Sequence, residues 1–266
     1  MRDFAYHKPA TIEAAAGLLA AIEDARVLAG GMTLLPTMKQ RLAAPEALVD
    51  LAALPLAGIT EAGGVVTIGA MTRHADVAAS ALLDRLLPGL AALAGGIGDP
   101  QVRHRGTIGG SVANNDPAAD YPAALLALGA EVVTDRRTLK ADDFFVGLFE
   151  TALEPGEIVT AIRFPAIRRA AYAKFRSPAS RYALAGVFVA ALPDGVRVAV
   201  TGAGPSVFRL PAMEAALDAD FTPEAARAVT IDPTGLNSDI HADALYRAHL
   251  VGVMAGRAVA AAIAFS

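Results

Sequence analysis

Two glycine-containing segments have the composition of anion-binding turns. The first glycine segment, Ala29-Gly30-Gly31-Met32-Thr33, joins a short apolar strand at 27–29 to a helical pattern at 34–42. Glycines let backbone N–H groups approach an anion closely, Thr33 adds a hydroxyl donor, and the start of the following helix favours negative charge. A Gly-Gly turn between a strand and a helix is more often only a tight turn, so this segment alone does not establish a phosphate site.

A second glycine segment strengthens the interpretation. Thr107-Ile108-Gly109-Gly110-Ser111 again combines paired glycines with hydroxyl side chains, and it leads towards a helical pattern at 118–128. Two donor-rich segments that converge on a diphosphate supply many N–H and O–H partners without a lysine or a magnesium ion. Together the two segments predict a dinucleotide site.

Other chemical motifs are missing from the sequence. Neither glycine segment matches GxGxxG, no Walker lysine motif is present, and Gly202-Ala203-Gly204-Pro205 lacks the third glycine and has a proline without an N–H donor. No catalytic acid, base or nucleophile stands out, so we expect no catalytic residue in this chain. We also expect no metal site, because the histidines have no ligand spacing. They are His7, His74, His104, His241 and His249.

The elements around the first glycine segment alternate between helix and strand. Thr11 suits the N-cap of a helix with an apolar face from Ile12 to Ile22, and a further strand is expected at 47–51. The stretch 95–115 has little periodicity and is expected to be an irregular loop. Other helices and strands are expected at 65–68, 74–80, 82–94, 118–128, 130–134 and 157–164.

The second part of the chain has a different pattern. Pro165 and Arg168-Arg169 suggest a domain boundary. Three strands, at 171–175, 182–192 and 196–201 with Asp194-Gly195 as a hairpin turn, precede helices at 210–217, 223–229 and 242–264. Strands followed by helices are typical of an α+β fold. We therefore expect an N-terminal domain at 1–166, with subdomains at about 1–53 and 54–166, and a C-terminal domain at 167–266.

Composition limits the remaining functions. The chain contains no cysteine, which excludes disulfides, thiol nucleophiles and iron–sulfur ligation by its own residues. The formal net charge is −4 and basic residues are scattered, so we expect no nucleic-acid partner. The N-terminus lacks a signal-peptide pattern, and the apolar stretch 250–265 is short and interrupted by Arg257. We expect a cytoplasmic protein without a membrane span.

Longer stretches around both glycine segments resemble a known family. AGGMTLLPTMKQRLA at 29–43 and RGTIGGSVANNDPAADYPAALLAL at 105–128 resemble the FAD-binding medium subunit of molybdenum hydroxylases, the relatives of carbon monoxide dehydrogenase and xanthine dehydrogenase. YAKFRSPASRYALAGV at 172–187 and DIHADALYRAHLVGVMAGRA at 239–258 resemble the C-terminal flavoprotein domain of the same family. The resemblance implies a two-subdomain FAD-binding domain of the vanillyl-alcohol-oxidase or PCMH type. A C-terminal domain with a three-stranded antiparallel sheet and a helix bundle would follow it.

The resemblance also assigns residues to FAD. It implies that both glycine segments bind the diphosphate and that Gly98 lies in a loop against the cofactor. Asp120 would hydrogen-bond the adenosine side, Ile158 would pack against the cofactor, Lys174 would lie close to the flavin, and Tyr182 would lie beside the isoalloxazine ring. The residues assigned are Ala29, Gly30, Gly31, Met32, Thr33, Gly98, Thr107, Ile108, Gly109, Gly110, Ser111, Asp120, Ile158, Lys174 and Tyr182. Met32 departs from the family, in which a polar residue is common at this position.

Several of these residues also have ordinary structural interpretations. Asp120 suits the N-cap of the helix that follows it. Lys174 alternates with apolar residues and fits a solvated strand face, and Tyr182 fits a half-buried strand position. Arg103-His104-Arg105 could neutralise a diphosphate, contact a partner or face solvent.

At the level of the whole protein, the resemblance implies a heterotrimer that often dimerises. A small subunit would carry two [2Fe–2S] clusters, a large subunit the molybdenum cofactor, and this chain FAD, which would pass electrons to an acceptor such as NAD⁺ or a quinone. Two alternatives are a stand-alone FAD-dependent oxidoreductase and a non-redox scaffold that has lost FAD.

Overall fold

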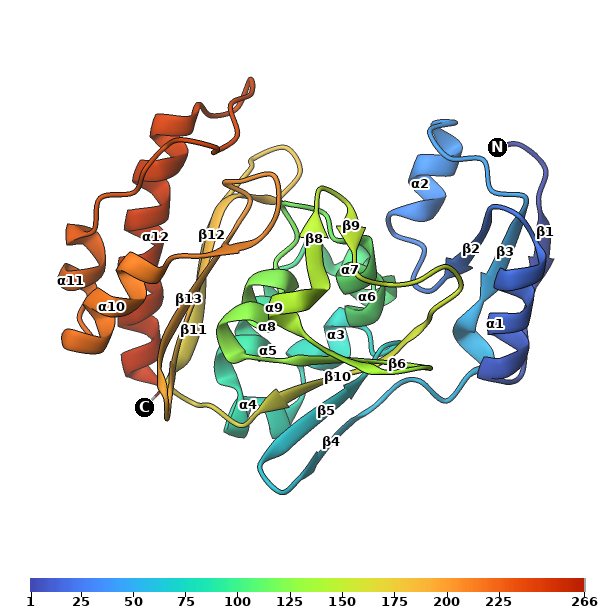
Figure 1. The fold of residues 1–266 in the computed structure, drawn as a ribbon, viewed down its shortest axis with the longest axis horizontal. Coiled ribbons are helices and arrows are strands. Elements are labelled where there is room, and N and C mark those ends of the chain that lie inside the picture. The colour runs from blue at the N-terminus through green and yellow to red at the C-terminus, as the bar shows by residue number, and fades with distance from the viewer. Residues whose placement is uncertain (266) are drawn as a thin grey trace.

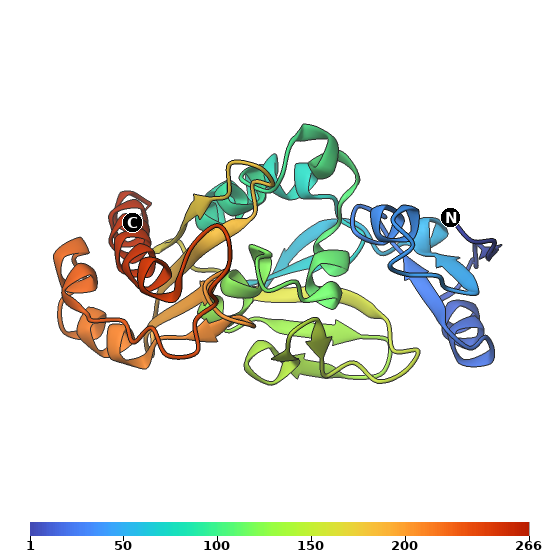
Figure 2. The same ribbon diagram turned by 90° about the horizontal axis from the view of Figure 1, so that it is seen from above.

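The three larger sheets follow one another along the long axis of the molecule in the order of the sequence (Figure 1). The structure is a computed structural model that describes residues 1–265. Seen from above, the N-terminal and C-terminal parts lie at opposite ends, with the middle sheet and its helices between them (Figure 2). The fold is α+β, as the order of patterns in the sequence predicts.

The N-terminal sheet is parallel and small, with strand order β1-β3-β2. Its elements are β1 (Ala5–His7), α1 (Ile12–Ala21), β2 (Ala25–Leu28), α2 (Leu34–Lys39), β3 (Ala47–Asp50) and the short 3₁₀ helix η1 (Leu51–Ala53). Thr11 caps α1 as expected, because its hydroxyl accepts a hydrogen bond from the N–H of Ala14 at 3.2 Å. Parallel strands need crossover connections, which explains the alternation of helix and strand in this part of the sequence.

The middle sheet is antiparallel, with strand order β4-β5-β10-β6-β7. Its strands are β4 (Ile59–Ala62), β5 (Val65–Gly69), β6 (Glu131–Thr134), β7 (Thr138–Lys140) and β10 (Val159–Pro165). Helices and a small hairpin complete this part: α3 (His74–Ala78), α4 (Ala81–Leu86), α5 (Pro88–Gly95), α6 (Pro100–Arg105), α7 (Ile108–Asn114), α8 (Tyr121–Leu128), α9 (Ala141–Phe144), β8 (Phe145–Gly147) and β9 (Glu150–Thr151). A continuous apolar core joins the sheet to α5 and α8, which explains why α8 is apolar on all sides.

The expected irregular loop at 95–115 is wrong, because this stretch forms α6 and α7. Each helix begins at a capping side chain: Asp99 Oδ1 accepts from the N–H of Val102 at 2.8 Å, and Thr107 Oγ1 accepts from the N–H of Gly110 at 3.2 Å. The helices have 6 and 7 residues, fewer than two turns, so they leave too few positions for an apolar period to be visible in the sequence.

The C-terminal sheet is antiparallel and has four strands, one more than expected, in the order β11-β12-β13-β14. Its elements are β11 (Ala170–Arg176), β12 (Ala183–Leu192), β13 (Gly195–Thr201), β14 (Phe208–Arg209), α10 (Pro211–Ala219), α11 (Pro223–Ala228) and α12 (Ala244–Ala264). Val187 and Val189 belong to the core formed with these helices, whereas Phe188 and Ala190 belong to the core of the middle part. The sheet is therefore covered on both faces, and the two parts of the chain share one apolar interface.

Helix α12 confirms the long helix expected at 242–264, to within two residues at its start. Its 21 residues are enough, by length and composition, to cross a membrane, and 56% of its most apolar window is buried in the protein. Its buried residues include Val251, Met254 and Val259, which pack in the core beneath β11 and β12. Because these residues are buried in the protein, α12 is apolar in the way that a core helix is.

Candidate cofactor site

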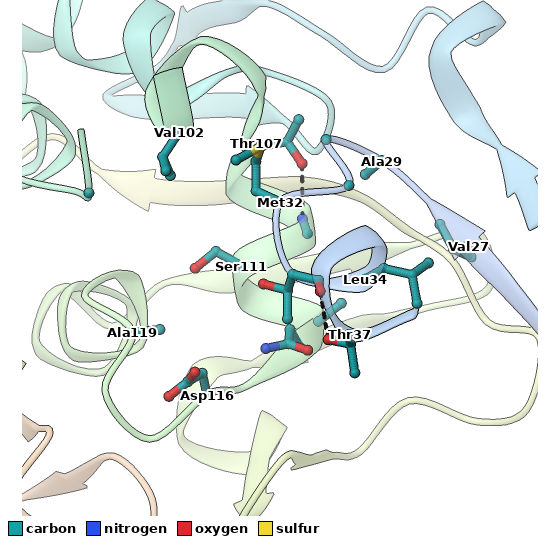
Figure 3. A pocket seen from close by; sticks show the side chains of 18 of the residues that line it. Val27, Ala29, Met32, Leu34, Thr37, Val102, Thr107, Ser111, Asp116 and Ala119 are labelled. Carbon is teal, nitrogen blue, oxygen red and sulfur yellow. Dashed lines mark hydrogen bonds between the residues drawn. The ribbon is translucent and has the colours of Figure 1, made fainter. Parts of the chain in front are cut away.

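A cavity of about 800 Å³ lies where the N-terminal, middle and C-terminal parts meet. Residues from 24–45, the stretch 97–120 and the loop before β12 contribute to its wall. Figure 3 shows Leu34 and Thr37 on one side of this first cavity and Ser111, Asp116 and Ala119 on the other, with Met32 beside Thr107. Its volume falls in the range of about 300–1,000 Å³ that is typical of small-molecule sites.

The first glycine segment lies along the first cavity over its whole length, from Ala29 to Thr33. Within residues 1–265, the backbone N–H groups of Gly30, Gly31, Met32 and Thr33 have no hydrogen-bond partner in the protein. Gly31 has φ of +72°, a conformation that favours glycine. Unpaired N–H groups along a cavity wall need an acceptor from a ligand or water, so this segment fits an anionic group. Met32 stands where relatives often have a polar residue, but its backbone N–H group is still available to a ligand.

Gly30 also fixes how closely the two halves of the site approach each other. A Cβ at this position would lie 2.2 Å from the carbonyl oxygen of Arg105 and 2.8 Å from the Cα of Gly106. These two residues directly precede the second glycine segment. Only a residue without a side chain lets the first segment pack against this backbone, so the glycine has a packing role besides its exposure of an N–H group.

The second glycine segment is a helix start rather than a loop with free amides, which corrects the sequence interpretation. The N–H groups of Ile108 and Gly109 donate to the carbonyls of Thr72 and Ala70, at 3.0 and 2.9 Å, and that of Gly110 donates to Thr107. Thr107, Gly110 and Ser111 line the first cavity, whereas the side chain of Ile108 is buried in the core. This segment therefore offers the cavity its hydroxyl groups and the bare backbone of its glycine. Its N–H groups are not available, because they donate hydrogen bonds that hold α7 to the middle part.

Gly98 and Tyr182 lie on the wall of the first cavity. Gly98 has φ of +49°, and the Arg103 guanidinium donates to the carbonyls of Ile97 and Gly98 at 2.8 and 3.3 Å. Arg103 thus supports this loop.

Tyr182 directly precedes β12 and is 43% exposed, so it lies one residue outside the strand that was expected to begin at this position. Burial and the nearby carboxylates raise the pKa of Tyr182, and a hydrogen bond with the Thr33 side chain opposes the rise.

Asp120 and Lys174 form a buried ion pair. The Lys174 Nζ atom is 2.8 Å from Oδ2 of Asp120, and the Tyr172 hydroxyl donates to Oδ1 of the same carboxylate at 2.5 Å. Asp120 lines the first cavity, but its side chain does not cap α8. The capping interpretation of Asp120 and the solvated-face interpretation of Lys174 are both wrong, because the two groups neutralise each other inside the protein. Lys174 is not among the residues that line either cavity, and it is linked to the first cavity through Asp120. This contact brings the two residues together, although the sequence resemblance assigns one to the adenosine side and the other to the flavin.

Ile158 lines a second cavity, which has a volume of about 670 Å³. This cavity is between α1 and β2 on one side and residues 153–159 on the other, and Gly109 lines it as well. Ala29, Gly110 and Ala113 border both cavities, so the two spaces lie side by side at the glycine segments.

The sequence analysis did not identify His74 as part of the site. Its side chain is buried, lines the first cavity, and packs against the Tyr121 ring with 5.4 Å between ring centroids. Burial, helped by the positive charge of Arg103, lowers the pKa of His74 to about 4. A single histidine without ligand spacing gives no signal in the sequence. Asp116 was also missed, and burial raises its pKa above the usual range.

The site combines unpaired backbone donors, hydroxyl groups and a tyrosine in a two-part cavity, which defines a dinucleotide-binding protein of the α+β class. Residues 2–167 match the family described as "FAD binding domain in molybdopterin dehydrogenase". The chain is 39% identical to the carbon monoxide dehydrogenase medium chain of Hydrogenophaga pseudoflava, over 97% of this chain and 96% of that one. It is 38% identical to the nicotine 6-hydroxylase medium subunit of Paenarthrobacter nicotinovorans, over 96% of this chain and 95% of the relative.

The solved structures agree with the sequence relatives. A chain in the structure of carbon monoxide dehydrogenase from Hydrogenophaga pseudoflava superimposes with a TM-score of 0.90 at 40% identity, covering 99% of this chain and 98% of that one. The protein therefore belongs to the family of FAD-binding medium subunits of molybdenum hydroxylases. The N–H groups at 30–33, unpaired among the described residues, fit the diphosphate of FAD, which needs donors, and the two adjacent cavities offer space on either side of the glycine segments.

Proposed function

We propose that FAD binds across the two cavities, with its diphosphate at the two glycine segments. One observation carries the proposal: the free N–H groups of 30–33 face Thr107, Gly110 and the hydroxyl of Ser111 in a single space. Backbone and hydroxyl donors neutralise a diphosphate through many directed hydrogen bonds, without a lysine. In this arrangement Ala29 and Gly98 form the cavity wall beside the cofactor.

The ends of the cofactor lie on either side of the glycine segments. The flavin end is near Tyr182, whose ring offers a planar surface for stacking. The Asp120–Lys174 pair belongs to this end, because Asp120 acts electrostatically on Tyr182. The other end extends into the second cavity, where Ile158 supplies apolar contact and Gly109 leaves room.

The site lies mainly between the two proposed subdomains of the FAD-binding domain. The FAD-binding domain comprises residues 1–166, with subdomains at about 1–53 and 54–166, and has the vanillyl-alcohol-oxidase or PCMH type of fold. The C-terminal flavoprotein domain comprises 167–266. The position of the first cavity between the parallel N-terminal sheet and the helices of the middle part supports this division.

The proposed role of the chain is electron transfer in a cytoplasmic complex. A small subunit with [2Fe–2S] clusters supplies electrons, a large subunit holds the molybdenum cofactor, and an acceptor such as NAD⁺ or a quinone removes them. Relatives named medium chain and medium subunit support the complex, and the absence of cysteine requires that any cluster be on a partner. When bound, FAD takes up single electrons and releases them in pairs. The residues of this chain bind, orient and shield it.

The proposal is tested by the visible spectrum of the purified chain, alone and co-expressed with its neighbouring subunits. We expect about one FAD per chain, the stoichiometry of a single preformed site. Gly110→Leu should lose FAD, because a side chain there would meet Thr107 Oγ1 at 3.0 Å and Ala29 Cβ at 3.6 Å. Gly252→Ala is the control, since nothing lies within 4 Å of its added Cβ. Wild-type flavin content in Gly110→Leu would contradict the site, and a flavoprotein that never associates with cluster or molybdenum subunits would support the stand-alone enzyme.

A further inference from the structure

One wall of the first cavity belongs to the middle part of the chain but is held by the C-terminal part. This wall segment runs from Asp116 to Asp120, and Asp116, Ala119 and Asp120 line the cavity. Figure 3 shows Asp116 and Ala119 on the side opposite α2. The segment connects α7 to α8 through a turn, in which the carboxylate of Asp116 accepts from the N–H of Ala118 at 2.8 Å and its carbonyl accepts from the N–H of Ala119 at 2.9 Å.

Thr201, at the end of β13, makes the central contact with this wall segment. Its Oγ1 atom is 2.7 Å from the carbonyl oxygen of Pro117 and 2.6 Å from that of Ala119. The N–H group of Gly202 donates to the same Pro117 carbonyl at 2.7 Å. Thr201 is fully buried, and without its hydroxyl proton the carbonyl of Ala119 would lose this hydrogen bond.

A buried arginine fixes the end of β13 from behind. The Arg247 Nη1 atom donates to the carbonyls of Gly202 and Leu184 at 2.9 and 2.7 Å, and its Nη2 donates to Asp239 at 2.6 Å. The Arg247 side chain is 3% exposed. Because a guanidinium can hold several acceptors in one plane, the end of β13 presents Thr201 in a defined position.

We propose that Thr201 is a positioning residue for FAD: its hydroxyl holds the carbonyls of Pro117 and Ala119 so that the wall segment keeps the shape that the cofactor needs. The C-terminal region, which lies outside the matched range 2–167, thereby completes the cofactor site. This inference rests on the proposed placement of FAD in the first cavity. A threonine hydroxyl that served only stability would change the unfolding temperature but not the affinity for FAD.

The full-length chain, freed of flavin, allows the two roles to be separated. FAD is titrated while its fluorescence is followed, and the unfolding temperature of the flavin-free protein is measured in parallel. Thr201→Val removes the hydroxyl and keeps the shape, whereas Thr201→Ser keeps the hydroxyl. Thr160→Val is the control, because the Thr160 hydroxyl also donates to a strand carbonyl, that of Val133 at 3.1 Å, in a partly buried position away from the wall segment.

We expect Thr201→Val to raise the dissociation constant for FAD about tenfold, the effect of one lost hydrogen bond of about 1.4 kcal/mol. Thr201→Ser should restore the wild-type affinity, and Thr160→Val should change only the unfolding temperature. Unchanged affinity in Thr201→Val, or equal losses in Thr201→Val and Thr201→Ser, would overturn the inference. If Thr201→Val does not fold, Thr201→Ala takes its place with the same expectations. Tight FAD binding by Gly110→Leu would instead refute the proposed site itself.

Discussion

Lys174 and Asp120 lie 54 residues apart in the sequence, yet their side chains form an ion pair of 2.8 Å with only 5% of each side chain exposed. Lys174 is on β11 of the C-terminal sheet, and Asp120 directly precedes α8 of the middle part. The pair therefore connects the two parts beside the cofactor cavity. Burial raises the pKa of Asp120, and the Lys174 ammonium opposes that rise.

Removing one partner of this pair should be strongly destabilising. Lys174→Met leaves the Asp120 carboxylate buried without its cation, and such changes cost about 3–5 kcal/mol. The free energy of unfolding from urea titration measures the effect. Glu224→Gln, which breaks the exposed pair with Arg227, is the control and should cost less than about 1 kcal/mol. Similar losses in the two variants would contradict a special role of the buried pair.

Gly30→Ala should lower the affinity for FAD by separating the two glycine segments. The added Cβ would lie 2.2 Å from the Arg105 carbonyl oxygen, which belongs to the backbone and cannot rotate away. Gly17→Ala in α1 is the matched control, because nothing lies within 4 Å of its Cβ, and helix propensity predicts a gain of roughly 0.5–1 kcal/mol in stability. Flavin content after purification compares the two variants. Full occupancy in Gly30→Ala would show that the close approach is not needed.

The elements that the sequence predicts well are those whose own residues determine them. The strand β12 has a continuous apolar run because both of its faces are buried, and α1 has a capping threonine followed by an apolar face. The N-terminal strand β1 is three residues long and mostly exposed, so it has no apolar pattern and was missed. Its existence depends on pairing with β3.

In the candidate site, too, some features follow from the local sequence and others depend on distant contacts. The first glycine segment is recognisable because glycine and hydroxyl residues are unusual at that spacing. By contrast, the N–H groups of Ile108 and Gly109 are consumed by the carbonyls of Thr72 and Ala70, residues that lie far back in the sequence. Thr201 could not be identified either, since a threonine at the end of a strand is ordinary until its contact with the wall segment is seen.

His74 should make the protein less stable as the pH falls below neutrality. Its pKa is lowered from 6.5 to about 4 in the folded state, so between these values the unfolded chain binds a proton that the folded chain does not. Stability is therefore lost from pH 6.5 down to about 4, by on the order of 3 kcal/mol.

Unfolding at pH 7 and pH 4.5 tests this expectation. His74→Gln cannot bind the proton, so its stability should fall less than that of the wild type over this interval. His249→Gln replaces an exposed histidine on α12 and should behave like the wild type. If His74→Gln and the wild type lose stability in parallel, the buried histidine does not govern the acid response.

Tyr182 should control the fluorescence of bound FAD. An aromatic ring stacked on the flavin quenches its emission, and Tyr182 lies on the wall of the first cavity. We expect Tyr182→Leu to increase the emission of bound FAD and Tyr182→Phe to increase it less, because phenylalanine keeps the stacking surface. Tyr246→Leu is the matched control: this tyrosine is equally exposed at 43% but packs against Phe175 and does not line the cavity. Equal emission from Tyr182→Leu and Tyr246→Leu at the same flavin content would mean that the isoalloxazine ring is not beside Tyr182, and the flavin end would then have to be assigned to the second cavity near Ile158.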